Sequence, residues 1–321
     1  MKPKHVTTKR GGFVLVVVLG LVLALMPLVL GFNLKTRHHL RTTDALQRSR
    51  QALRFARSGL QMAIATLRHQ DPCSLGAPRH LELGSATCSV TFIPVQGKLN
   101  VNRLNDSQGR PDRRRIDQLL RLIDLINKEL DPDQRIGYGL VPVLLDWTDK
   151  DEKTTLLPFV QQENKGAESA YYQGLDPPYA CDNRPLISLR QFTALKGMTP
   201  ATLARLRDYL TVHGDGLVDL NHAPKLVLQS LSPQCGPALA QMIIDRRRHH
   251  PWKHWEELQQ LPGMTASLFH TLKRVATLNA DHPFVEVRVQ SQVSGIGRSL
   301  WALLKRNSST KMVDVLEVEE L

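Results

Sequence analysis

The sequence predicts an α+β fold in which a long N-terminal helix joins a small antiparallel sheet and a large, mainly helical segment is inserted between the strands. Three observations support this prediction. An apolar run continues into a leucine stripe with helical spacing, strand-like alternation occurs towards both ends of the remaining chain, and helical patterns dominate between them. Because the last strands would have too few partners alone, we expect one sheet that contains the insertion.

The apolar run covers residues 13–32 and contains no charged residue in twenty positions. A helix of this length spans about 30 Å, which is the thickness of the hydrocarbon core of a bilayer. Four basic residues precede it and favour a cytoplasmic leader: Lys2, Lys4, Lys9 and Arg10. The run is therefore predicted to anchor the chain in a membrane.

The residues just before the run have the pattern of a processed leader. Lys9-Arg10-Gly11-Gly12 is followed at once by Phe13, which opens the apolar run. This arrangement resembles the leader of a type IV prepilin. The resemblance implies cleavage between Gly12 and Phe13 by a prepilin peptidase, followed by N-methylation of Phe13. A cleaved secretory signal and a plain uncleaved anchor are the alternatives, although no small-residue cleavage site follows the run.

The helix is predicted to continue to about residue 68. Leu46, Leu53, Leu60 and Leu67 recur every seven residues, and the first helix breaker is Asp71-Pro72. Alanines on the same side of the helix suit packing against a sheet. A coiled-coil dimer is the alternative use of this stripe.

The positive charge is concentrated near the N-terminus. Of the net charge of +12, residues 1–12 carry +4 and residues 33–70 carry +7, which leaves +1 for residues 71–321. A nearly neutral body does not indicate a nucleic-acid-binding surface. The rival hypothesis is a membrane-anchored DNA-binding or DNA-uptake protein, because residues 258–272 resemble a helix-hairpin-helix DNA-binding unit and residues 189–209 have a similar pattern.

The four cysteines are Cys73, Cys88, Cys181 and Cys235, and none belongs to a CxxC pair. An even count in a chain exported past a membrane suggests disulfide bonds. Sequence order favours Cys73–Cys88 and Cys181–Cys235, which is one of three possible pairings. Four buried thiols are the alternative.

A series of short motifs occurs in a fixed order along the body. They are residues 97–102 (GKLNVN), 145–151 (LDWTDKD), 166–168 (GAE), 177–179 (PPY), 183–185 (NRP) and 219–224 (DLNHAP). The series resembles the minor pseudopilin K family of type II secretion systems, from the leader to the last strands. The resemblance implies a pilin-like base with a large inserted helical domain that contains SAM-like, helix-hairpin-helix units.

The same resemblance implies a function in protein transport. It describes a minor pseudopilin at the tip of a pseudopilus, which initiates assembly and supports secretion of proteins across the outer membrane. We expect a single pass through the cell inner membrane, a periplasmic body, an inner-membrane assembly platform, and partners of the I and J pseudopilin types. Most pilin-like subunits have a glutamate at the fifth position after the cut, whereas this chain has Val17. The K subunit typically lacks that glutamate.

These inferences predict five segments. They are the leader at 1–12, the transmembrane part of the stem at 13–32, the stem and first strands at 33–105, the inserted helical domain at 106–280, and the C-terminal strands at 281–321. Strands are expected at residues 87–93, 285–290, 299–303 and 313–318, and residues 97–102 are expected to pair with the first of them.

An acidic segment around Asp146, Asp149, Asp151 and Glu152 is the strongest candidate for a site. Carboxylates two and three positions apart can turn several oxygens towards one hard cation. The family resemblance implies a structural calcium ion held by Asp149, Asp151, Glu168 and Asn183. A solvated acidic turn is the plain alternative, and a calcium-dependent adhesin is another functional one. The sequence has no GxSxG, P-loop or HExxH motif, so we expect no enzyme and no catalytic residue.

Overall fold

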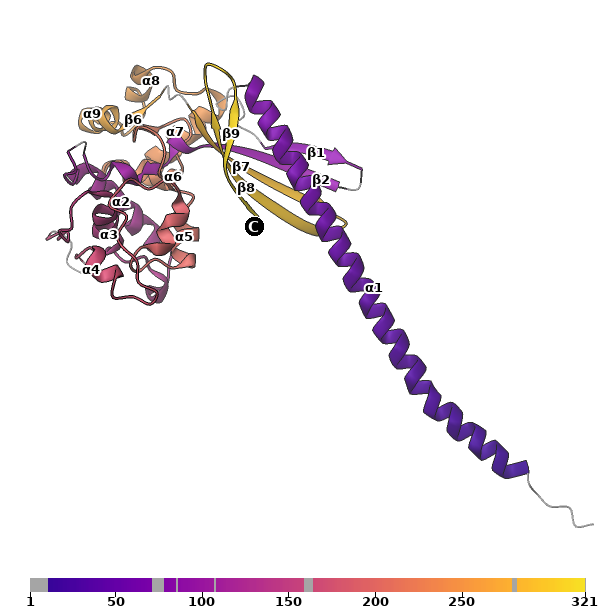
Figure 1. Ribbon diagram of the computed structural model, residues 1–321. Helices are drawn as coiled ribbons and strands as arrows, with labels where there is room; N and C mark the ends of the chain where they lie inside the picture. The colour runs from indigo at the N-terminus through magenta and orange to yellow at the C-terminus, as the bar shows by residue number, and fades with distance from the viewer. Residues whose placement is uncertain are drawn as a thin grey trace, which may run out of the picture.

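The fold has three parts: a long stem helix, a five-stranded antiparallel sheet, and a helical insertion (Figure 1). It is seen in a computed structural model that describes residues 11–70, 78–84, 86–106, 108–158, 164–278 and 282–320. The predicted α+β class is confirmed. The insertion lies beside the end of the sheet, and the N-terminal half of the stem extends away from both (Figure 1).

The stem helix α1 (Gly11–His69) has 59 residues, so it is about 90 Å long. It continues through Pro27 without ending. Its C-terminal half packs on the sheet through a buried stripe that consists of Ala52, Ala56, Leu60, Ala63 and Leu67. Intramolecular packing therefore occupies the face that a coiled coil would have needed. Leu46 was predicted to belong to this stripe, but it lies on the part of the helix below the sheet and is 61% exposed.

The sheet has the strand order β1-β2-β7-β8-β9, with every neighbouring pair antiparallel. Its strands are β1 (Arg79–Leu83), β2 (Ala86–Pro94), β7 (Phe284–Val293), β8 (Ile296–Arg306) and β9 (Val313–Glu320). The strands predicted near 87–93, 285–290, 299–303 and 313–318 are confirmed. Strands β2 and β7 pair along their full lengths although about 190 residues separate them in the sequence.

Close contact between the stem and the sheet depends on Gly59. A Cβ atom at this position would lie 2.7 Å from Cys88 Sγ and 2.7 Å from Val289 Cγ1. Carbon atoms do not approach other heavy atoms this closely without a shift, so only glycine lets the helix backbone settle on the strands. Cys88 is buried in this interface.

The insertion starts directly after β2 and returns directly before β7, so it spans residues 95–283. This differs from the predicted start at residue 106. Leu99–Asn100 form strand β3, which pairs in parallel with β4 (Leu210–Thr211) and not with β2. The expected pairing of residues 97–102 with 87–93 is therefore wrong, because the chain has already left the sheet at η2 (Val95–Gly97).

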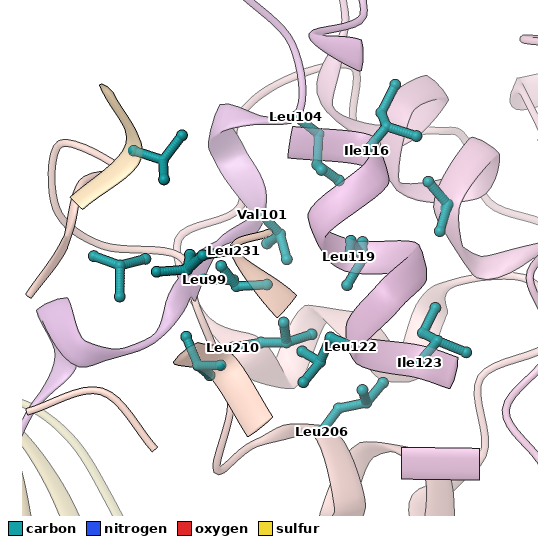
Figure 2. Packing of buried hydrophobic residues seen from close by; sticks show 14 of the residues in the cluster. Leu99, Val101, Leu104, Ile116, Leu119, Leu122, Ile123, Leu206, Leu210 and Leu231 are labelled. Carbon is teal, nitrogen blue, oxygen red and sulfur yellow. The ribbon is translucent and has the colours of Figure 1, made fainter. Parts of the chain in front are cut away.

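The remaining elements of the insertion are mostly short helices. They are η3 (Val101–Arg103), α2 (Arg113–Asn127), η4 (Pro132–Gln134), α3 (Leu140–Thr148), α4 (Ser169–Tyr172), η5 (Leu189–Ala194), α5 (Pro200–Leu206), β5 (Val218–Asp219), α6 (Lys225–Ser230), α7 (Pro237–His249), α8 (Trp255–Gln259), α9 (Ala266–Val275) and β6 (Ala276–Thr277). Their core forms around α2, whose buried face contacts Val101, Leu206, Leu210 and Leu231 from other elements (Figure 2).

The two predicted hairpin units have the same local construction. In the first, η5 leads through Gly197 to α5, and in the second, α8 leads through Gly263 to α9. Both glycines have a positive φ, 75° and 85°, which a residue with a side chain rarely adopts. The threonine two residues later then caps the second helix, with Thr199 accepting from Thr202 N and Thr265 from Leu268 N.

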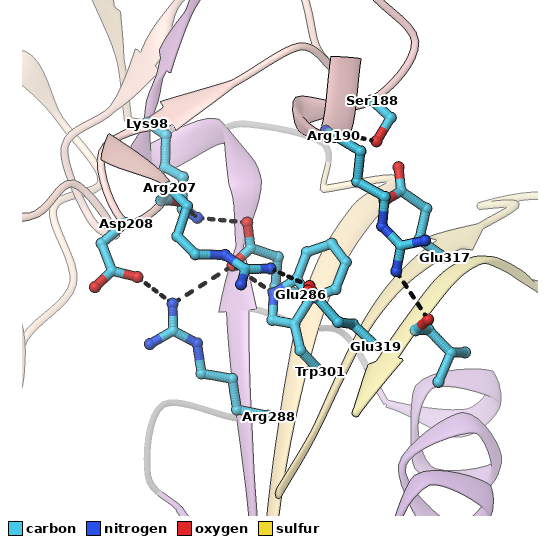
Figure 3. A network of polar contacts seen from close by, with 11 residues as sticks. Lys98, Ser188, Arg190, Arg207, Asp208, Glu286, Arg288, Trp301, Glu317 and Glu319 are labelled. Atoms are coloured by element: carbon cyan, nitrogen blue, oxygen red, sulfur yellow. Dashed lines mark hydrogen bonds and ion pairs between the residues drawn. The ribbon is translucent and has the colours of Figure 1, made fainter. Parts of the chain in front are cut away.

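A polar network joins the insertion to the sheet (Figure 3). Lys98 donates to Glu286 and, over 2.7 Å, to the carbonyl oxygen of Arg207. Arg207 lies over the ring of Trp301 at 4.9 Å and pairs with Glu319 at 2.8 Å. We refer to residues 94–98 and 282–286, where the chain enters and leaves the insertion, as the joint.

Candidate functional site

The exposed half of the stem is the first functional feature. The 18 residues Leu15–Phe32 have a mean hydropathy of 2.9, and none of them is buried within the chain. Phe13 is 77% exposed and Val17 is 51% exposed. A helix of this length and composition is a candidate membrane anchor.

The predicted processing site lies at the start of this helix. Gly12 and Phe13 are within the first turn of α1, and residues 1–10 lie outside the described part of the chain. Cleavage between Gly12 and Phe13 and methylation of Phe13 stay predictions.

The second feature is a buried acidic cluster of Asp146, Asp149 and Glu168, which is a candidate metal centre. Asp146 lies in the last turn of α3, Asp149 is the C-cap residue directly after this helix, and Glu168 is the N-cap residue directly before α4. Each offers a carboxylate oxygen, and these oxygens lie within 4.8 Å of one another. The three residues are 0%, 9% and 3% exposed.

The cluster contains several oxygens that no donor satisfies. Asp146 Oδ2, Asp149 Oδ1 and both carboxylate oxygens of Glu168 are buried without a hydrogen-bond partner. Asp146 Oδ1 is different, because it accepts from Thr155 N at 2.8 Å. Buried carboxylates without donors are costly unless a cation neutralises them.

The raised pKa values of the three carboxyl groups reflect the same cost of burying negative charge. Burial, with repulsion from Asp151 and Asp146, raises the pKa of Asp149 to about 7. Burial, with repulsion from Asp146 and Asp149, raises the pKa of Glu168 to about 8. Burial also raises the pKa of Asp146. Without a cation, the fold therefore disfavours the charged forms of all three groups.

The structure links Asn183 to the acidic segment through Asp151 and Glu152, and leaves the Asp151 side chain exposed. Asn183 has a positive φ of 47°, and its Oδ1 is buried without a partner. Its Nδ2 donates to Asp151 O at 3.1 Å and to Glu152 Oε1 at 2.8 Å. Asp151 is exposed, and its Oδ1 accepts from Lys153 N. Of the predicted ligands, Asp149 and Glu168 thus converge, Asn183 has a buried oxygen without a partner, and Asp151 contributes charge.

Asp146 was predicted to belong to the acidic segment, but it was not in the ligand set that the resemblance implies. The signal for it in the sequence is its spacing of three from Asp149, which places both on one side of a helix end. Gly166 makes room for it, since a Cβ there would lie 2.1 Å from Asp146 Oδ2.

The donor set fits a calcium ion. Calcium takes six to eight oxygen ligands, and the free oxygens of Asp146, Asp149, Glu168 and Asn183 are hard donors of this kind. No nitrogen or sulfur ligand is included in the cluster. An ion here would tie Asp149 and Glu168 to Asp146 of α3, which is a structural role.

The cysteines do not form the predicted Cys181–Cys235 bridge. Both thiols are free and buried, and they lie in different surroundings. Cys181 Sγ is 3.7 Å from Asp146 O beside the acidic cluster, whereas Cys235 lines a hollow of about 800 Å³ together with Arg121 and Tyr138. Cys88 is also a free thiol, and Cys73 lies outside the described residues. Packing thus makes the described cysteines small apolar core residues.

Comparison with known proteins supports the family resemblance. Residues 97–215 match the family model described as type II secretion system (T2SS), protein K. The predicted resemblance to protein K is confirmed. A type II secretion system protein K of Aeromonas hydrophila is 25% identical to this chain, with 95% of this chain and 96% of that protein aligned. A protein K of Klebsiella pneumoniae is 23% identical over 44% of this chain and 41% of its own length.

A solved structure shares the fold. One chain in the crystal structure of the GspK–GspI–GspJ complex from the type 2 secretion system of enterotoxigenic Escherichia coli matches with a TM-score of 0.56 and 20% identity. The match covers 89% of this chain and 99% of that chain. These protein K relatives give no support to the DNA-binding hypothesis.

Proposed function

We propose that this chain is the minor pseudopilin K of a type II secretion system. It occupies the tip of a periplasmic pseudopilus, initiates its assembly, and supports secretion of proteins across the outer membrane. The observation that carries this proposal is the stem: one helix presents a free apolar half, packs its other half on the sheet, and so supports a bulky insertion at the far end (Figure 1). The protein K match over the insertion is consistent with it.

A tip position follows from shape and charge. A subunit within a filament must leave room for another above it, but here the insertion projects sideways from the sheet near the C-terminal end of the stem and makes this end of the molecule wide (Figure 1). Val17 also carries no charge that could pair with the terminal amine of a neighbour. Assembly, not catalysis, is therefore the proposed activity.

The proposed partners are pseudopilins of the I and J types. The E. coli structure that shares this fold is a complex with GspI and GspJ, and exposed apolar residues of the stem such as Leu40 and Leu46 give partner helices a surface to pack on. A photo-crosslinking residue at Leu46 of the full chain should capture these partners in cells. The same residue at Lys253, exposed on the insertion, is the matched control. Capture from Lys253 but not from Leu46 would contradict packing through the stem.

The proposal includes processing and location. The chain enters the cell inner membrane with its body in the periplasm, a prepilin peptidase cuts between Gly12 and Phe13, Phe13 is methylated, and an inner-membrane platform assists assembly. Support comes from the leader pattern and the free apolar half of α1. Mass spectrometry of the mature protein should find N-methylated Phe13 as its first residue. An intact Met1, or a cut beyond residue 31, would refute this part.

A structural calcium ion is also proposed at Asp146, Asp149, Asp151, Glu168 and Asn183. When bound, calcium would supply the positive charge that the unpartnered oxygens lack. At a concentration a hundred times its Kd, it would stabilise the fold by about 2.7 kcal/mol. Thermal unfolding of the full chain in detergent should therefore shift upwards with calcium and not with an equal concentration of magnesium.

Variants separate this site from non-specific binding. Glu168→Gln should abolish most of the calcium-dependent shift, and Gly166→Ala should do the same because its methyl group would displace Asp146 Oδ2. Asp133→Asn removes an exposed carboxylate and serves as the control. A shift of the same size in Glu168→Gln as in the unmodified chain would refute the proposed site.

A further inference from the structure

Asp219, His222 and His282 form a second cluster at the joint, separate from the acidic one. Asp219 ends β5, His222 follows in the next turn, and His282 precedes β7. One ligand atom from each lies within 4.8 Å of the others. The side chains of Asp219 and His282 are 1% and 2% exposed, whereas that of His222 is 19% exposed.

The carboxylate of Asp219 is fixed so that one oxygen faces both imidazoles. Its Oδ1 accepts from Asn221 N at 2.9 Å. Its Oδ2 is 2.5 Å from His222 Nδ1 and 3.0 Å from His282 Nε2. Two ring nitrogens and one carboxylate oxygen therefore converge on the same point.

Gln96 determines which nitrogen of His282 is free. His282 Nδ1 lies 3.2 Å from Gln96 Oε1, and an amide oxygen can only accept, so Nδ1 carries the hydrogen. In a neutral ring Nε2 then points a lone pair at Asp219 Oδ2. Two lone pairs that face each other at 3.0 Å repel, so this contact requires a cation between the two atoms, either a proton or a metal ion. Metal-binding histidines are commonly held by this kind of outer hydrogen bond.

We propose that Asp219, His222 and His282 bind a transition-metal dication of the zinc type. Imidazole nitrogens with one carboxylate oxygen suit zinc and its neighbours, whereas calcium prefers oxygen alone. In a tetrahedral site with bonds of about 2.0–2.1 Å, ligand atoms lie roughly 3.3 Å apart. The separations of 2.5 and 3.0 Å need to widen by less than about 1 Å to accept such an ion.

The partial exposure of His222 leaves a side from which water can complete the coordination. A charged neighbour is Arg247, whose guanidinium donates to Leu220 O at 2.5 Å and lies near enough to Asp219 to interact with it. The metal would link β5 to His282, where the chain leaves the insertion. Through the contact of His282 with Gln96, it would also link β5 to the segment where the chain enters the insertion. It would thus fasten the joint.

Cobalt(II) is a suitable probe, because its visible absorption reports four-coordinate geometry. The full chain in detergent, with calcium present to fill the acidic cluster, is titrated with cobalt and then with zinc as competitor. We expect one equivalent of cobalt to give the tetrahedral spectrum and zinc to displace it. Gln96→Met should weaken binding about 10–100-fold at unchanged stoichiometry, and His222→Gln should weaken it by more.

His222→Gln is the decisive variant, since its partly exposed position lets it fold, which circular dichroism would check. His249→Gln with His250→Gln removes an exposed histidine pair on the surface and should leave binding unchanged. The proposal is overturned if the unmodified chain gives no tetrahedral spectrum, if binding disappears with His249 and His250, or if folded His222→Gln binds cobalt as tightly as before.

Discussion

The buried ion pair between Lys98 and Glu286 makes a quantitative prediction about the joint. The two side chains are 2% and 4% exposed (Figure 3). Lys98→Met removes an ammonium group that donates to both Glu286 and the carbonyl of Arg207. Removing one partner of a buried pair costs roughly 3–5 kcal/mol, because the other charge stays buried.

The remaining contacts of Glu286 place the expected loss near the lower end of that range. Trp301 Nε1 still donates to its Oε2 at 3.3 Å, and Arg288 stays 3.8 Å from the same oxygen. We therefore expect a loss of about 3 kcal/mol in the free energy of unfolding. For a fold of this size the midpoint of thermal unfolding would fall by roughly 6–12 °C.

A double-mutant cycle tests the reasoning. Burial lowers the pKa of Lys98, although the negative charge of Glu286 raises it. Removing the two charges from water therefore offsets much of their attraction for each other. Lys98→Met combined with Glu286→Leu should return to within about 1 kcal/mol of the unmodified chain, since well-packed apolar groups replace buried pairs at little loss. The measurement is urea unfolding of the full chain in detergent, followed by circular dichroism.

The control is Arg184→Met, which breaks the exposed pair with Asp182 and should change stability by less than about 1 kcal/mol. The reasoning is refuted if Lys98→Met costs no more than this control. It is also refuted if the double variant loses the sum of the two single losses.

Three further predictions follow from burial. Gly59→Ala should destabilise the fold by about 1–3 kcal/mol in thermal unfolding, because its methyl group would meet sheet atoms 2.7 Å away, whereas Gly20→Ala projects into open space and should not. Burial and nearby Lys305 lower the pKa of His213 from 6.5, so the fold favours the neutral ring. The contribution of this residue to stability is therefore present above pH 6.5 and lost as the pH falls. His213→Phe should reduce the loss of stability between about pH 7 and 5. Burial raises the pKa of Cys181 to about 12 and that of Cys235 to about 11, so both stay protonated at pH 8. Because the thiolate is the reactive form, iodoacetamide should modify them only after denaturation, which peptide mass spectrometry would show.

Hydrophobic patterns in the sequence predicted those helices and strands correctly in which the pattern extends over many residues. The stem is confirmed because 59 residues contain no effective breaker, and the longer strands are confirmed because their alternation reflects one buried face. Strand β1 was missed, since its five residues form an edge with little burial. Strand β3 was assigned to the wrong partner, because its pairing with β4 depends on the packing of residues about 110 positions apart.

The candidate metal centre was predicted only in part for a similar reason. Spacing within residues 146–152 indicated a group of carboxylates, but which of them turn inwards depends on where α3 ends. Asp146 is drawn inside by the helix, whereas Asp151 stays in the exposed loop. The predicted Cys181–Cys235 pairing is wrong because sequence order does not show that these two residues lie in different surroundings.

The way the insertion is attached gives the charged contacts at and around the joint a structural role. The chain enters the insertion after β2 and leaves it before β7, and these two strands are neighbours in the sheet. The insertion of about 190 residues is therefore joined to the sheet by two adjacent backbone connections. Strand neighbours lie about 5 Å apart, and so narrow an attachment would act as a hinge if nothing else restrained it. Contacts from Arg190 to Glu317 and from Arg207 to Glu319 extend the attachment across to β9, the opposite edge of the sheet from β1 (Figure 3). Because α1 packs on the face of this same sheet, a load on the insertion passes to the stem through the network and not through the two connections alone.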